Sequence, residues 1–240
     1  MGLFSAKCPV STEAQQWIDA SMTWFCGQFG TDAARRRVVE PSPEFFPDPY
    51  AATDADVRRV LDRVCGFIGV DSARVRLELL SSDDEDVLRH LPSHATSSSG
   101  AAAEYVRDGD NSIITISRRT AADPMYVVAA IAHELGHARL LGEDRIDRSR
   151  KDQEQLTDLV TVFLGMGIFT ANAAFDFAAH QDDRRTGWSA QRLGYLSEQM
   201  FGYALAVWAR LRDEEDPGWA RHLDTNPRAY MKQATRWLAR

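Results

Sequence analysis

The strongest constraint on this chain is an apolar stretch, VVAAIAHELGHARLLG (residues 127–142), that carries two histidines and a glutamate within five positions. Apolar residues surround most of a helix here, so we expect the helix to be buried. Asp123 and Pro124 form a typical start, an N-cap aspartate before a proline at the first helical position. Gly142 stands where a C-cap glycine is expected. Gly136, inside the polar group, would let another element approach the helix closely.

The two histidines, His133 and His137, are four residues apart and therefore lie one turn apart on one helix face. Two neutral imidazoles placed this way can share a zinc ion, each at about 2.0–2.1 Å. Glu134 is rotated by about 100° from His133, so it lies beside the metal, where it can hold a zinc-bound water and take its proton. This is the H-E-x-x-H motif of metal-assisted peptide hydrolysis. A purely structural polar cluster is the alternative, but burying it without a metal would leave costly unsatisfied polar atoms.

A catalytic zinc is expected to have three protein ligands and one open position. The residues after His137 do not continue as H-x-x-G-x-x-H, which excludes the metzincin pattern. The candidates for the third ligand are Glu154 and Asp158, one turn apart on the same face of a helix expected at 151–170. Spacing alone leaves either carboxylate open as the ligand, and also an ordinary pair of carboxylates near a helix start.

Together these residues resemble the zinc core of the gluzincins, the metallopeptidase group that includes thermolysin. The resemblance rests on HELGH (133–137) followed by E-x-x-x-D (154–158), and it covers about residues 102–170. It implies that Glu154 is the third zinc ligand and that Asp158 hydrogen-bonds the first zinc histidine. The connection between the two helices is shorter than in thermolysin and similar to that of small, single-domain gluzincins. An aspzincin-like alternative, in which Asp158 binds the zinc, stays open.

The same resemblance implies a zinc-dependent metalloprotease, a hydrolase with Glu134 as general base and a peptide or protein as substrate. It also implies a later tyrosine or histidine that stabilises the oxyanion. Four residues are candidates, and the sequence does not choose among them: Tyr195, Tyr203, His180 and His222. The alternative function is a zinc-binding regulatory or interaction module that uses the gluzincin fold with little or no proteolytic turnover.

The patterns predict an α+β fold with a small zincin-like core. We expect a single domain, 1–240, with a helical N-terminal part and a proline- and aromatic-rich arm (1–70), a zincin core (71–170) and C-terminal helices (171–240). The periodicities favour helices at 11–29, 53–69, 189–212 and 226–240, a strand at 73–82, a hairpin over 102–120 and an extended arm at 40–50.

The second strand of the hairpin, residues 113–117, ends shortly before the HELGH helix. We expect this strand to be the edge of a few-stranded sheet and to lie beside the zinc. An edge strand has unpaired N–H and C=O groups, so an extended peptide could bind there as an added strand.

Composition limits the function classes. The net charge of −7 and the lack of a long basic stretch argue against a general nucleic-acid binder. Three widely spaced cysteines form no disulfide framework, and the N-terminal sequence has no export signal, so we expect a cytoplasmic protein. Residues 159–175 are uncharged, but they are few and partly polar, which favours a buried helix over a membrane span.

Overall fold

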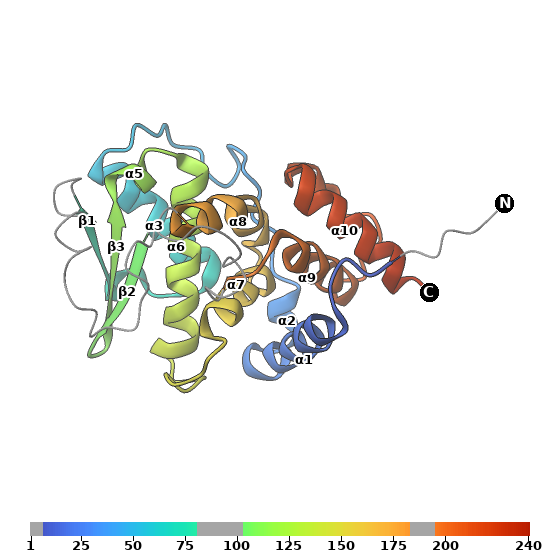
Figure 1. Ribbon diagram of the computed structural model, residues 1–240. Coiled ribbons are helices and arrows are strands. Elements are labelled where there is room, and N and C mark those ends of the chain that lie inside the picture. Colours follow the sequence, from blue (N-terminus) through green and yellow to red (C-terminus); the bar gives the residue numbers. More distant parts are fainter. Residues whose placement is uncertain (1–6, 81–102, 183–194) are drawn as a thin grey trace.

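The computed structural model describes residues 7–80, 103–182 and 195–240. Within these residues the chain is α+β, as predicted, with a small mixed sheet at one end and helices in the rest (Figure 1). The helices are α1 (Thr12–Phe29), α2 (Thr31–Ala34), α3 (Asp54–Ile68), η1 (Ser72–Arg74), α5 (Arg118–Ala121), α6 (Pro124–His137), η2 (Ala138–Gly142), α7 (Gln153–Phe163), α8 (Gly167–Asp182), α9 (Glu198–Leu211), η4 (Gly218–His222) and α10 (Thr225–Leu238). The strands are β1 (Val75–Leu80), β2 (Ala103–Asp108) and β3 (Asn111–Ser117).

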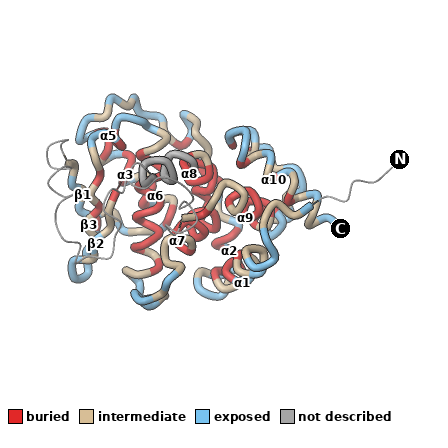
Figure 2. Tube along the Cα trace, in the orientation of Figure 1, coloured by how far each residue is buried: buried red, intermediate tan, exposed pale blue. Residues whose placement is uncertain are grey.

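Helix α6 lies between the sheet and the helices α7 and α8 (Figure 1). Every residue from Val127 to His137 is buried, which appears as a continuous red stretch in Figure 2. The helix starts as predicted, because the Asp123 carboxylate accepts hydrogen bonds from the amides of Met125 and Tyr126. Helices α1 and α9 pack on α7, and α10 packs on α9.

The end of this helix differs from the prediction. After His137 the chain continues as one π-helical turn through Gly142, and the positive φ falls on Asp144, at 52°. Gly142 is therefore not a left-handed cap. A glycine is needed at this position because the Tyr105 side chain approaches closely: a Cβ would lie 2.8 Å from the hydroxyl oxygen of Tyr105 on β2.

The sheet has the order β1-β3-β2, with β3 parallel to β1 and antiparallel to β2. The predicted hairpin is present, and Asp108 pairs with Asn111 at its turn. The prediction that residues 113–117 form the edge strand is wrong, because β3 is central and paired on both sides. The reason is that β1, which comes earlier in the chain, adds to the free side of the hairpin. Of the described strands, β2 packs most extensively against α6 and is an edge.

The helix expected at 151–170 is interrupted. It forms two helices, α7 and α8, with a break at Gly165, whose φ is 91°. A Cβ at this glycine would lie 2.7 Å from the carbonyl oxygen of Arg37, and the Val39 amide donates to the Gly165 carbonyl. The break is therefore fixed by the segment 37–39, which packs directly against Gly165.

None of the helices in the described ranges is long and apolar enough to cross a membrane.

The C-terminal helix predicted at 226–240 is present as α10. The other, predicted at 189–212, begins only at Glu198, where the Ser197 side chain caps it, and residues 189–194 lie outside the described residues.

The arm at 40–50 is pinned by its rings, as expected: Phe45 and Phe46 both make edge contacts with Phe67. It is not extended throughout, because a turn forms where the Phe45 and Phe46 amides donate to the Ser42 carbonyl.

Gly136 allows α7 to approach α6, as predicted. A Cβ there would lie 2.9 Å from Cγ2 and 3.2 Å from the backbone oxygen of Thr157. Gly136→Ala is therefore expected to lower the free energy of unfolding by about 1–3 kcal/mol, measured by urea denaturation. Gly66→Ala is the matched control: this exposed α3 glycine has open space around it, so alanine should stabilise by about 0.5–1 kcal/mol. Equal stability of Gly136→Ala and the wild type would contradict the tight contact.

Candidate metal site

Two imidazoles and one carboxylate converge between α6 and α7. The Nε2 atoms of His133 and His137 lie 3.1 and 3.4 Å from Oε2 of Glu154. Ligand atoms of the three residues all lie within 4.8 Å of one another. On a tetrahedral ion with bonds of about 2.0–2.2 Å, neighbouring ligand atoms are about 3.4 Å apart. The three residues therefore could hold a metal ion.

Each histidine has a polar partner at its other ring nitrogen. Nδ1 of His133 lies 2.8 Å from Oδ1 of Asp158, and Nδ1 of His137 lies 3.2 Å from the Thr157 hydroxyl. In a neutral imidazole, a carboxylate that accepts the Nδ1 proton leaves the lone pair on Nε2, where a metal would bind. The hydrogen bond predicted between Asp158 and His133 is present.

Asp158 itself is poorly placed to be the third ligand. One of its oxygens faces His133, and the other accepts a hydrogen bond of 2.9 Å from the backbone amide of Leu196. Both oxygens of Asp158 are thus engaged in hydrogen bonds away from the space between the two histidine Nε2 atoms and Glu154. The geometry favours Glu154 over the aspzincin-like alternative.

The electrostatics of the group suit a cation. Burial by itself lowers the pKa of His133, but the hydrogen bonds with Asp158 and Glu154 outweigh it and hold that pKa well above its ordinary value. Burial likewise raises the pKa of Glu154, but its hydrogen bonds with the two histidines prevail and bring that pKa well below its usual range. The surroundings therefore favour positive charge beside the Nε2 atoms, where a divalent cation would bind.

Glu134 lies on α6 next to the ligands and is 6% exposed. Burial raises the pKa of this carboxyl, and the nearby His133 and His137 reduce the effect without cancelling it. A buried carboxylate with a raised pKa is a stronger proton acceptor than an exposed one.

The start of α7 is held by a contact that the sequence did not indicate. The carboxylate of Asp152 accepts hydrogen bonds from the indole of Trp17 on α1, at 2.7 Å, and from Arg150, at 2.6 Å. Asp152 lies two residues before Glu154, so this contact fixes the turn that carries Glu154.

Two tyrosines flank the histidines. The ring of Tyr195 lies 5.3 Å from that of His133, and the ring of Tyr105 on β2 stacks on that of His137 at 6.0 Å. Tyr195 is one of the four candidates named from the sequence. The sequence analysis did not name Tyr105, although it lies in the predicted hairpin that precedes the HELGH helix.

Two of the other candidates, Tyr203 and His222, bind carboxylates outside the group. The hydroxyl of Tyr203 donates to the carboxylate of Asp19 on α1. Nε2 of His222 lies 2.8 Å from a carboxylate oxygen of Glu40. The side chain of His180 lies outside the described residues. Among the described candidates, Tyr195 is therefore the one beside a histidine of the group.

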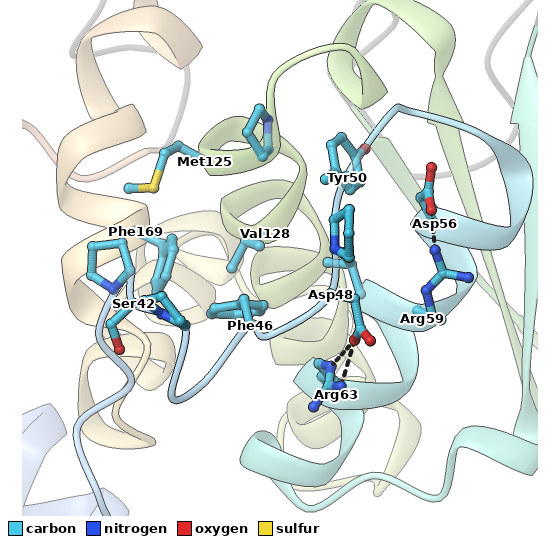
Figure 3. A pocket seen from close by; sticks show the side chains of 15 residues that line it. Ser42, Phe46, Asp48, Tyr50, Asp56, Arg59, Arg63, Met125, Val128 and Phe169 are labelled. Carbon is cyan, nitrogen blue, oxygen red and sulfur yellow. Dashed lines mark hydrogen bonds and ion pairs between the residues drawn. The ribbon is translucent and has the colours of Figure 1, made fainter.

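A separate cavity of about 290 Å³ lies beneath the proline-rich arm (Figure 3). Its walls include Phe46 of the arm, Met125 and Val128 of α6 and Phe169 of α8. At its rim Asp48 and Arg63 form an ion pair, drawn as dashed lines in Figure 3. The described residues that line it include no histidine, whereas the HELGH helix carries two.

Comparison with known proteins finds no matching family model, no matching curated protein and no matching solved structure. Function is therefore inferred from the residues of this chain and their geometry.

Proposed function

We propose that the chain is a zinc-dependent metallopeptidase of the gluzincin type that hydrolyses peptide bonds. The observation that carries this proposal is the convergence of His133, His137 and Glu154, with Glu134 buried beside them on the same helix as the histidines. Two imidazoles and one carboxylate are the ligand set of a catalytic zinc that keeps one position open.

Each residue then has a distinct task. Zinc, when bound, lowers the pKa of water and polarises the substrate carbonyl. Glu134 takes the proton of the attacking water and later gives it to the leaving amine. Tyr195 donates a hydrogen bond to the carbonyl oxygen as negative charge develops there. Asp158 holds the ring of His133.

The substrate-binding strand has to be reassigned, since β3 is paired on both sides. Among the described strands, β2 pairs with β3 alone, so the backbone groups on its other side bind no described strand. This strand also packs against α6. An extended peptide could bind along this edge, next to Tyr105 and the metal ligands.

The ligand assignment predicts an order of zinc affinities. Glu154→Gln loses a ligand and is expected to weaken zinc binding by more than about 100-fold. Asp158→Asn changes a residue that acts through His133, and such changes typically cost about 10–100-fold. Competition with a chelator of known affinity measures both dissociation constants. The reverse order would assign the third ligand to Asp158.

The proposal is tested by incubating the zinc-loaded chain with a peptide library and analysing the products by mass spectrometry. Cleavage that stops on chelation and returns with zinc is the expected result. Stable zinc binding without cleavage of any peptide would instead favour a binding module that uses the same metal site.

A further inference from the structure

Asp158 connects two parts of the chain that are far apart in sequence. Its Oδ1 lies 2.8 Å from Nδ1 of His133 on α6, and its Oδ2 accepts the Leu196 N–H at 2.9 Å, just before α9. Asp158 and Leu196 are 3% and 2% exposed, so water does not compete for either bond. One buried carboxylate therefore holds both a candidate metal ligand and a backbone amide.

The amide of Leu196 adjoins the tyrosine beside the site. On one side, Tyr195 packs its ring 5.3 Å from that of His133. On the other, the Ser197 side chain accepts from the Met200 amide and fixes the first turn of α9. The bond to Asp158 thus lies between a fixed helix start and the tyrosine.

We propose that Asp158, besides its bond to His133, is a positioning residue for Tyr195: through the Leu196 amide it holds this tyrosine where its hydroxyl contacts the substrate carbonyl. This inference rests on the proposed peptidase function. A carboxylate suits the double task because two N–H donors meet on it. Asparagine has one acceptor oxygen and one NH₂ group, so it can serve only one of the two donors.

The first test does not need turnover. Hydrogen exchange of the Leu196 amide, followed by NMR, is compared between the wild type and Asp158→Ala, with at least about tenfold faster exchange expected in the variant. Thr161→Val is the matched control, because it removes a neighbouring buried bond, from the Thr161 hydroxyl to the Asp158 carbonyl, and leaves the carboxylate in place. An equally protected Leu196 amide in Asp158→Ala overturns the inference.

The second test uses a peptide that the wild type cleaves. Leu196→Pro removes the amide hydrogen, Leu196→Met keeps it, and Tyr195→Phe removes the hydroxyl. Relative to Leu196→Met, Leu196→Pro is expected to lower kcat by about 100-fold, comparable to losing one oxyanion donor, with one zinc still bound per chain.

The double variant decides the mechanism. If the amide acts through Tyr195, adding Leu196→Pro to Tyr195→Phe lowers kcat no further. If instead the double variant loses kcat by the product of the two single-variant factors, the two residues act independently and the inference is overturned. A wild type that cleaves no peptide contradicts the proposed function instead, while the exchange measurement still decides whether Asp158 holds this segment.

Discussion

Glu134→Gln is expected to abolish peptide hydrolysis while the chain still binds one zinc ion. Glutamine keeps the size of the side chain but cannot accept the proton of the attacking water, and general-base catalysis contributes about 10²–10⁴-fold. The measurement is kcat/KM on a cleaved peptide, together with metal analysis of the same preparation.

Glu143→Gln is the matched control for this prediction. Glu143 pairs with Arg139 and Arg145, away from the cluster, so its charge should not matter for hydrolysis. Cleavage by Glu134→Gln at the wild-type rate would remove this residue from the mechanism.

The second large effect is expected from His137→Ala, which should abolish zinc binding and with it all hydrolysis. The substitution removes one of the three proposed ligands, and the remaining imidazole and carboxylate would leave the ion underligated. The test is the zinc content of the purified variant after dialysis, determined by elemental analysis.

His222→Ala is the control for His137→Ala, because the His222 ring pairs with Glu40 and not with the cluster. This variant should retain one zinc per chain. Full zinc occupancy in His137→Ala would show that the metal binds elsewhere.

The candidate site could be predicted from the sequence because its geometry is local. His133 and His137 are brought together by one helical turn, and Asp123 and Pro124 fix the start of that helix. The meeting with Glu154 required only that the next helix pack against the first, which Gly136 permits. Short-range rules of this kind need no knowledge of the rest of the chain.

The features that were predicted wrongly or left open depend on contacts between distant residues. The order of the sheet depends on β1, which precedes the hairpin in the chain. It pairs with the edge of β3 that does not bind β2, so β3 becomes the central strand. The break at Gly165 depends on the carbonyl of Arg37. The proximity of Tyr195 to His133, which singles it out among the described oxyanion candidates, depends on a contact between residues far apart in the chain. None of these contacts has a signature in a short stretch of sequence.

The claim that bound zinc enables this chain to cut peptide bonds is tested most directly by titrating the metal-free chain with zinc. The rate of hydrolysis of a library-derived peptide is followed together with the bound zinc. We predict that the rate rises in proportion to zinc and levels off at one ion per chain, while Glu134→Gln takes up the same zinc without hydrolysis. A zinc-saturated wild type that cleaves no peptide, or a rate that is unchanged when the zinc is removed, would contradict the claim.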